Sequence, residues 1–193
     1  MMSSGACGSF EISEIDFDIC HIQDEVLYFS CVYQADSWKK ASSCCIKGTI
    51  ENYFKECLEA HPEGPSGSKA VFANPSDPDR RNFELQAYRT NIIYDGLSVA
   101  FTVTVNNEQY CLCCSEEMEL FFKKENCPDT IIGEKSGIIF FQKQFSEGNE
   151  SFKFEASLLK NYYLAVSEDN GKRKLVLKKN YDEVDETQMF DIN

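Results

Sequence analysis

The first 36 residues contain no lysine and no arginine, although they carry seven acidic residues. All 19 basic residues therefore lie in the remainder of the chain, which opens with the stretch Ser-Trp-Lys-Lys. The whole protein is acidic, with a formal net charge of −13 over 193 residues. This charge excludes a non-specific nucleic-acid binder, because neutralising phosphates requires a surplus of lysine and arginine.

The sequence also lacks a long apolar run. No stretch approaches the roughly 18 to 20 consecutive apolar residues that a membrane-spanning helix needs, so we expect no membrane insertion. The N-terminal stretch MMSSGACGSFEISEIDFDICHIQDEV has neither the basic nor the apolar region of a secretory signal. The sequence therefore predicts a protein that is made in the cytosol and that leaves the cell only by an unconventional route.

Motifs typical of enzymes and metal sites are missing as well. The sequence has no Gly-rich phosphate loop, no HExxH and no GxSxG. Its two histidines, His21 and His61, show no metal-ligand spacing to the cysteine cluster at 111–114. A Cys–His nucleophile pair using His61 is the remaining catalytic alternative. We expect a non-enzymatic protein that needs no metal and no cofactor.

The cysteines raise the question of a disulfide scaffold. Without a secretory signal, and in a chain long enough to bury a core, we expect reduced thiols that pack as small hydrophobic side chains. The run CLCC at 111–114 lies in an apolar alternating stretch, where adjacent residues point to opposite faces of a sheet. The ten cysteines are Cys7, Cys20, Cys31, Cys44, Cys45, Cys57, Cys111, Cys113, Cys114 and Cys127.

Beyond about residue 44, short runs rich in β-branched and aromatic residues alternate with turn clusters such as HPEGPSGS, NPSDPD and SEGNE. The pattern predicts about twelve short strands, which is typical of an all-β sandwich, barrel or trefoil and favours the trefoil. The predicted strands are residues 44–50, 53–58, 69–73, 82–88, 97–105, 109–114, 118–122, 138–145, 151–156, 162–166, 173–178 and 188–192.

The change in charge falls directly behind Tyr33-Gln34-Ala35-Asp36. Caspases cut after aspartate because a basic pocket holds its carboxylate, and this tetrapeptide is close to the one that inflammatory caspases favour. Ser37, the next residue, is small enough to follow the cut. The alternative is an ordinary loop, but the charge boundary favours proteolytic cleavage after Asp36.

Three segments of the C-terminal half carry a family resemblance: CPDTIIGEKSGIIFFQKQF, FKFEASLLKNYYLAVSEDNGKRKLVLKK and DETQMF. They resemble the interleukin-1 cytokine family, strongly over residues 97–192 and more weakly over 37–96. A proline common in the family is absent where Lys160 and Asn161 stand. The matching positions of the family's signature region are Phe154, Ser157, Tyr163, Leu164 and Ala165.

The resemblance implies a twelve-strand β-trefoil at 37–193, preceded by a propeptide at 1–36. It further implies a proinflammatory cytokine precursor, cytoplasmic until an inflammatory caspase activates it, whose mature form acts outside the cell as a monomer. Its partners would be the ligand-binding and accessory chains of a two-chain receptor, together with a soluble decoy protein. The alternative is a receptor antagonist or an intracellular trefoil module that binds without signalling.

The resemblance also assigns receptor-binding positions residue by residue. For the ligand-binding receptor chain it implies Lys47, Glu51, Asp77, Asp79, Arg89 and Lys143. Pro75 and Pro78 depart from the family pattern and would stiffen the loop that holds the two aspartates. For the accessory chain it implies Lys123, whereas Gly137 stands where the family has an acidic residue. For each charged residue, the alternative is a solvated side chain without a binding role.

Three further segments give predictions. Asp182-Glu183-Val184-Asp185 matches the tetrapeptide that executioner caspases prefer, although Glu186 is unfavourable after the cut; the alternative is an acidic turn that balances Lys178 and Lys179. The basic run GKRKLVLKK at 171–179 suggests heparin binding or nuclear import, but the apolar residues inside it favour a solvated strand face. The apolar stretch 26–33 predicts a strand in the propeptide, which we expect to dock on the trefoil near 44–50.

Overall fold

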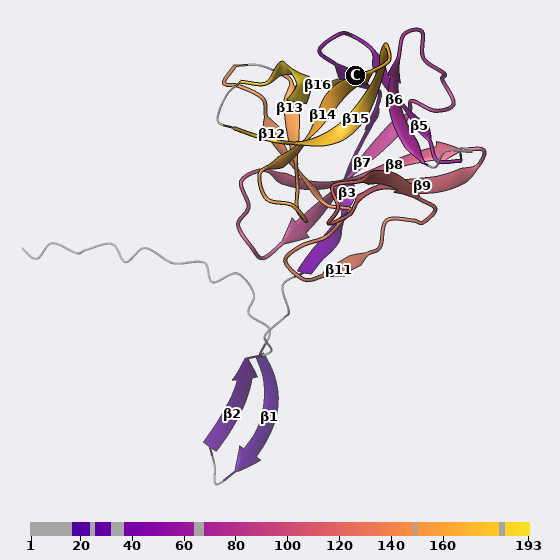
Figure 1. The fold of residues 1–193 in the computed structure, drawn as a ribbon. Coiled ribbons are helices and arrows are strands. Elements are labelled where there is room, and N and C mark those ends of the chain that lie inside the picture. Colours follow the sequence, from indigo (N-terminus) through magenta and orange to yellow (C-terminus); the bar gives the residue numbers. More distant parts are fainter. Residues whose placement is uncertain (1–16, 24–25, 32–36, 64–67, 149, 182–183) are drawn as a thin grey trace, which may run out of the picture. The chain divides into compact units, whose positions relative to one another are not determined.

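A computed structural model describes residues 17–23, 26–31, 37–63, 68–148, 150–181 and 184–193. The chain divides into two compact units, Met1–Ala35 and Asp36–Asn193 (Figure 1). Within the described residues, no helix has the length and apolar character to span a bilayer. The all-β prediction is confirmed, because strands make up almost all of the regular structure.

The first unit contains a β-hairpin of β1 (Phe17–Gln23) and β2 (Val26–Cys31). The two strands pair antiparallel, with Phe17 opposite Cys31 and Gln23 opposite Val26. The predicted strand at 26–33 is therefore present as far as Cys31, whereas β1 was not predicted. The prediction that this segment docks on the trefoil assumed an unpaired strand. Since β2 already pairs with β1, that reason for docking is weaker.

The second unit contains fourteen strands and one short 3-10 turn among its described residues. They are β3 (Ser37–Gly48), β4 (Ile50–Asn52), β5 (Cys57–His61), β6 (Lys69–Ala73), β7 (Phe83–Thr90), β8 (Leu97–Val105), β9 (Glu108–Cys114), β10 (Leu120–Lys123), β11 (Thr130–Ile132), β12 (Phe140–Gln144), β13 (Phe152–Ala156), β14 (Tyr162–Asp169), β15 (Lys172–Lys179), η1 (Glu186–Gln188) and β16 (Phe190–Ile192).

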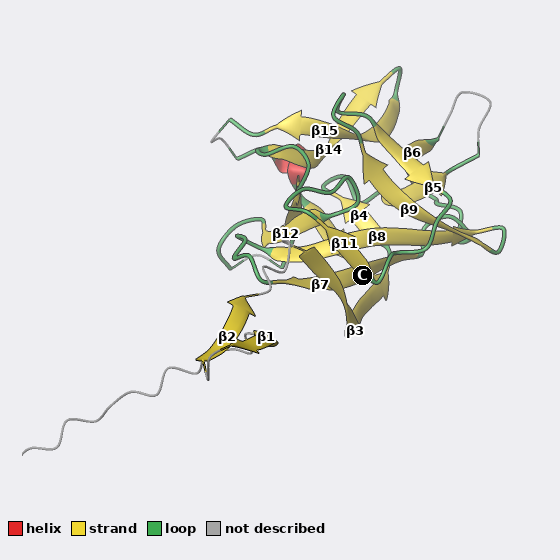
Figure 2. Cartoon of the chain, turned by 90° about the horizontal axis from the view of Figure 1, so that it is seen from below, coloured by secondary structure: helices red, strands yellow, loops and turns green. Residues whose placement is uncertain are grey.

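Antiparallel pairing closes part of this sheet on itself. The strand order runs β11-β3-β7-β8-β12-β13-β14-β15-β6-β5-β4-β16, and β9 pairs with both β8 and β10. A further pairing, of Phe152 on β13 with Phe190 on β16, joins two strands that are far apart in this order. Seven strands from β13 round to β16 thus form a closed ring, which removes free edges there. Figure 2 shows β7 and β8 running side by side with β3 beside them.

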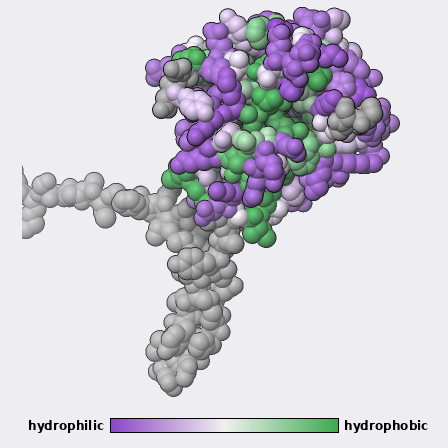
Figure 3. Space-filling model, viewed as in Figure 1, coloured by the Kyte–Doolittle hydropathy of each residue, from purple (hydrophilic) through white to green (hydrophobic). Residues whose placement is uncertain are grey.

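Aromatic side chains fill the main core. Phe101 packs edge-on against Phe140 and Phe154, with ring centroids 5.5 Å and 4.9 Å apart. Phe154 continues to Phe190, and Phe190 stacks on Phe72. These rings come from five different strands and all are buried. The closed ring therefore shares one apolar interior with β8 and β12. The face in Figure 3 is mostly hydrophilic around a central hydrophobic area.

A second, smaller core cluster lies on the other side of β9. Cys111 and Cys113 belong to it, together with Trp38 and Tyr88, whereas Leu112 and Cys114 belong to the main core. Neighbouring residues of CLCC thus face opposite sides of the sheet, as the sequence predicts. All six cysteines described at side-chain level are free thiols: Cys45 is exposed, Cys57 is half-buried, and Cys111, Cys113, Cys114 and Cys127 are buried.

Two strand predictions are wrong in detail. Residues 53–56 form a turn rather than the start of a strand, because the Asn52 side chain accepts hydrogen bonds from the backbone N–H groups of Phe54 and Glu56. The first strand of the unit begins at Ser37 instead of residue 44, and neither β4 nor β11 was predicted. The twelve predicted strands are thus fewer than the fourteen that the structure describes.

Candidate functional site

The segment Tyr33-Gln34-Ala35-Asp36, at which we expect cleavage, lies outside the described residues. Ser37, which would follow the cut, is half-buried and is the first residue of β3. Its backbone stands opposite Ile132 of β11. The division of the chain into compact units falls between Ala35 and Asp36. The expected cut would therefore spare every strand of the second unit.

Lys47 lies near the end of β3, opposite Glu84 of β7. Its ammonium donates a hydrogen bond to the Glu84 carboxylate, which raises the pKa of Lys47. The lysine side chain remains 72% exposed and the glutamate 34% exposed. Such an exposed pair adds little to stability, so it stays available to a partner. Glu84 was not singled out in the sequence, since only strand register places it beside Lys47.

Glu51 occupies the middle of β4, between two neighbouring strands. It stands opposite Cys57 of β5 on one side and Asp191 of β16 on the other. Asp191 in turn forms an ion pair with Lys55 in the turn after β4. Glu51 therefore lies in a charged group that β4, β16 and the turn after β4 contribute, and it is not an isolated surface residue.

The loop after β6 carries Asp77 and Asp79. Glu59, a buried residue of β5, stabilises the conformation of this loop. Its carboxylate accepts a hydrogen bond from the backbone N–H of Asp77. The Asp77 carboxylate accepts the backbone N–H of Asp79 at 3.0 Å and lies 3.5 Å from Arg80. Both aspartates are exposed. The loop thus presents two carboxylates on a backbone that the sheet holds in place.

Arg89 lies at the other end of the β3–β7 ladder. It stands opposite Lys39, and both side chains are exposed. Five residue steps along β7, from Glu84 to Arg89, separate it from the Lys47 pair by about 17 Å. The structure therefore does not bring Arg89 together with Lys47. It forms a separate basic site with Lys39, which the sequence analysis had not singled out.

Lys143 on β12 is placed differently from the other predicted contacts, because its side chain is only 16% exposed. Its ammonium lies 2.8 Å from the Glu155 carboxylate and 3.0 Å from that of Asp95. Burial alone would lower the pKa of Lys143, but these hydrogen bonds raise it above its usual range. Glu155 also accepts the backbone N–H of Asn161 at 2.7 Å. Lys143 thus serves as the counter-charge of a buried carboxylate.

We expect Lys143→Ala to lower the free energy of unfolding by roughly 3 to 5 kcal/mol, because Glu155 would be left buried without its cation. Chemical denaturation of the full chain measures this loss. Lys153→Ala is the matched control, because the Lys153 ammonium lies over the same Tyr163 ring as that of Lys143, 5.6 Å from the ring centroid. Losing this cation–π contact should lower the free energy of unfolding by only about 0.5 to 1 kcal/mol. Unchanged stability in the Lys143 variant would contradict the structural role.

For the accessory-chain surface, the structure places Lys123 at the end of β10. Its side chain is exposed and pairs with Glu125 at 2.6 Å. Gly137, where the family has an acidic residue, packs against β9: a Cβ there would lie 2.5 Å from the carbonyl oxygen of Cys114. The Gly137 carbonyl also accepts the Cys114 N–H at 2.7 Å. This close approach explains why a side chain is absent at this position.

A groove of about 700 Å³, lined by apolar and by charged side chains, was not predicted. It lies between the turn after β4 and the segment after β15. Four of its lining side chains are exposed to an unusual degree for apolar residues: Tyr53, Phe54, Tyr181 and Val184. Apolar side chains gathered in this way on a monomer mark an interaction surface. Because residues 53–58 were wrongly predicted as a strand, the sequence analysis did not identify Tyr53 and Phe54 as exposed.

The second candidate cleavage motif is described only at Val184 and Asp185. Val184 is 82% exposed, but Asp185 caps η1 and accepts hydrogen bonds from the Thr187 N–H at 3.1 Å and the Thr187 hydroxyl at 2.6 Å. Lys178 lies 2.6 Å from the same carboxylate. Burial opposes the shift, but the hydrogen bonds from Lys178 and Thr187 lower the pKa of Asp185. The carboxylate that a caspase would need is thus already engaged.

We expect the folded chain to resist executioner caspase at Asp185 under conditions that cut a free peptide of the same sequence. The reason is that both the carboxylate and the η1 backbone would have to leave their hydrogen bonds before entering a protease cleft. Mass spectrometry of the digest measures the cut. Lys178→Ala, which frees one partner of Asp185, should increase cleavage, whereas equal rates for the folded chain and the peptide would contradict the prediction.

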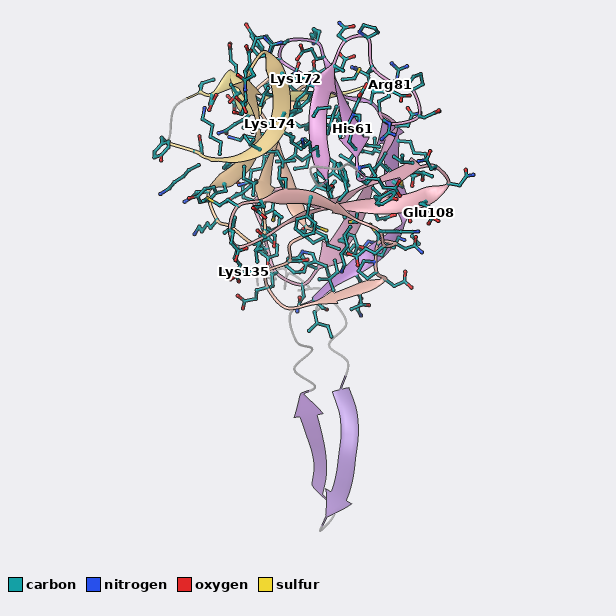
Figure 4. All side chains as sticks on the ribbon, turned by 45° about the vertical axis from the view of Figure 1, so that its right-hand side comes forward. His61, Arg81, Glu108, Lys135, Lys172 and Lys174 are labelled. Atoms are coloured by element: carbon teal, nitrogen blue, oxygen red, sulfur yellow. The ribbon has the colours of Figure 1, made fainter. Side chains whose placement is uncertain are left out.

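The basic run at 171–179 forms the turn before β15 and β15 itself. Figure 4 labels Lys172 and Lys174, which belong to β15, the strand that pairs with β6. Leu175 in the same strand is buried, and Arg173 is held by Glu56 at 2.6 Å and Glu168 at 3.0 Å. The run therefore combines one core residue with surface lysines. In the described part of the chain, no group of three or more His, Cys, Asp or Glu side chains is arranged to hold a metal ion.

Comparison with known proteins identifies the family of the chain. Residues 77–190 match the family model described as Interleukin-1 / 18. The chain belongs to this family. It is 35% identical to interleukin-18 of Gallus gallus over 158 residues, covering 76% of this chain and 80% of the relative. Interleukin-18 of Bos taurus and of Homo sapiens are 34% and 30% identical, each over 65% of this chain and 67% of the relative.

Solved structures confirm the trefoil prediction. A chicken interleukin-1 beta mutant superimposes with a TM-score of 0.58 at 13% identity, covering 81% of this chain and 99% of that one. A chicken interleukin-1 hydrophobic cavity mutant gives 0.57 at 13% identity, covering 80% and 98%. The chain is thus a β-trefoil cytokine of a non-enzymatic family whose members bind receptors and act outside the cell.

Proposed function

We propose that the chain is an interleukin-18-type precursor that an inflammatory caspase activates by cutting after Asp36. The observation that carries this proposal is the coincidence of two boundaries. The acidic leader ends at the aspartate of YQAD, and the compact second unit begins at the same residue. A cut there would remove the leader, with its β1–β2 hairpin, and leave Ser37 as the first residue of an intact β3.

The mature trefoil, 37–193, would bind the ligand-binding chain of an interleukin-18-type receptor and then recruit an accessory chain. Support comes from the exposed charges at Lys47, Asp77, Asp79 and Arg89. The groove lined by Tyr53, Phe54, Tyr181 and Val184 adds exposed apolar surface. Charges of both signs suit specific orientation of a partner more than raw affinity. Lys123 is the exposed candidate for the accessory chain, whereas Lys143 supports this surface from within.

The location of each form follows from this proposal. The precursor would reside in the cytoplasm, and the mature protein would act outside the cell after unconventional secretion. A soluble decoy protein that covers the same charged surface would be a further partner. The mature trefoil would act as a monomer.

One experiment tests both steps. The full precursor is treated with an inflammatory caspase, and the product is added to immune cells that carry an interleukin-18-type receptor. We expect a product that starts at Ser37 and drives receptor-dependent transcription, while the untreated precursor does not. Receptor binding without transcription would favour the alternative, a receptor antagonist. No binding at all would favour an intracellular trefoil module.

A further inference from the structure

A pocket of about 500 Å³ lies beside β15 and is lined by residues of β6, β10 and β15 and of the turn before β15. Four of its lining residues are basic: Lys69, Lys172, Arg173 and Lys174. Among the described residues that line it, Asp169 is the single acid. A chain with a formal net charge of −13 thus gathers positive charge at one pocket.

The alternation of β15 separates the lysines of this run from its core residue. Leu175 is buried in the main core, whereas Lys172 and Lys174, labelled in Figure 4, are exposed. The two lysines share the opposite face of the strand, because residues two apart point the same way. Leu175 interrupts the basic run in the sequence but does not interrupt the basic face. The reason for favouring a plain solvated strand is therefore removed.

Strand pairing brings a third lysine to the same face. Lys174 stands opposite Val71 in the antiparallel β15–β6 ladder, and Lys69 lies two residues from Val71 along β6. Such diagonal neighbours lie about 7 to 8 Å apart. Lys172 and Lys174 are separated by about 7 Å, which is the rise of two strand residues. Three lysines from two strands therefore line one face at nearly equal spacing.

The neighbouring acids leave most of this charge uncompensated. Arg173 is already held by two glutamates, so it adds little positive charge. Asp169 lies 3.9 Å from the Lys174 ammonium, but the two side chains are 64% and 50% exposed, so water and salt screen their attraction. Within the described residues, Lys172 takes part in no ion pair. Like charges at these spacings repel each other, and a bound anion would relieve that repulsion.

We propose that this pocket binds a sulfated polysaccharide of the heparin class through Lys69, Lys172 and Lys174. Sulfate oxygens accept hydrogen bonds from lysine ammonium groups, and successive sulfates on one chain can reach successive lysines. The proposal uses the extracellular action of the family, since polysaccharides of this class lie outside cells. It depends neither on cleavage after Asp36 nor on a particular receptor.

The shape of the pocket favours a single sugar chain over a lipid surface. Its apolar lining residues Ala70 and Leu175 are buried, and Leu120 is half-buried, so they can contact a sugar ring that enters the pocket. A protein that binds a bilayer inserts exposed apolar side chains beside its basic residues. None of the large exposed apolar side chains among the described residues lines this pocket.

Binding that rests on these charges should weaken steeply with salt, because a linear polyanion releases its condensed counterions when lysines neutralise it. Removing one lysine of the pocket should lower the affinity by about fivefold. It should also reduce the slope of log K against log salt by about 1. Since the protein is acidic overall, lysines away from the pocket should contribute little.

The test is a calorimetric titration of the full chain with a heparin oligosaccharide at several salt concentrations. Replacing both Lys172 and Lys174 with glutamine should weaken binding by about 25-fold. The matched control replaces Lys135 and Lys160, two other exposed lysines, and should change the affinity by less than about twofold. Equal losses in both variants would mean that net charge alone acts, and would overturn the proposal. Equal binding of the desulfated oligosaccharide would also overturn it.

Acetylation of the unsubstituted chain, measured by mass spectrometry, maps the site without any variant. The oligosaccharide should slow acetylation at Lys69, Lys172 and Lys174 and leave Lys135 and Lys160 unchanged. Unchanged rates at the three pocket lysines would contradict the proposed site. Vesicles that contain phosphatidylserine are the second probe: binding to them without binding to the oligosaccharide would replace the polysaccharide with a lipid surface. Neither measurement involves a caspase or a receptor, so failure here leaves the proposed function intact.

Discussion

Replacing Asp36 with alanine is expected to reduce cleavage by an inflammatory caspase by roughly 10⁴-fold. The protease pocket is built to pair a substrate carboxylate with arginine, and an alanine leaves those buried charges without a partner. The acidic leader would then remain attached, and the receptor response would be lost along with processing. The measurement is N-terminal sequencing of the digest, combined with the transcriptional assay on the same samples.

Asp24→Ala is the matched control for this experiment. It removes a different carboxylate from the same leader and changes the net charge equally, so cleavage should continue at the normal rate. If the Asp36 variant is processed normally, or if the natural product starts at a residue other than Ser37, cleavage after Asp36 is not the activating step. Processing at Ser37 without any receptor response would instead leave the cleavage intact and contradict the receptor assignment.

Phe154→Ala is expected to lower the free energy of unfolding by about 3 to 5 kcal/mol. The ring is 1% exposed and packs 4.9 Å from the ring of Phe101 and 6.2 Å from that of Phe190, centroid to centroid. Its loss removes apolar contacts and leaves a cavity in the closed ring of strands, where the neighbouring aromatic rings cannot easily move inward. Denaturant unfolding of the full chain gives the value directly.

Ile93→Ala is the control for this core variant, because its side chain is 99% exposed. Truncating it should change the free energy of unfolding by less than about 0.5 kcal/mol. A Phe154 variant as stable as the Ile93 variant would mean that the interior repacks, and that the aromatic cluster does not hold the trefoil together. A loss in both variants would point to a role for the loop before β8 in folding.

The sequence by itself determined the all-β class, because strands with one buried face show alternation and turn clusters that depend only on local order. The alternation in CLCC predicted correctly that Cys111 and Cys113 would face one side of the sheet and Leu112 and Cys114 the other. The charge boundary at Asp36 was likewise visible in the sequence, and it coincides with the limit of the compact unit. All of these features depend on residues that are neighbours along the chain, so they can be recognised without the tertiary structure.

Tertiary structure alone decided how distant residues meet. The turn at 53–56 has aromatic residues typical of a strand, and only the hydrogen bonds of the Asn52 side chain expose Tyr53 and Phe54. Lys143 has the sequence context of a surface lysine, yet Glu155 and Asp95 close around it. Pairing between strands sets such distances, and strand register cannot be read from either strand on its own.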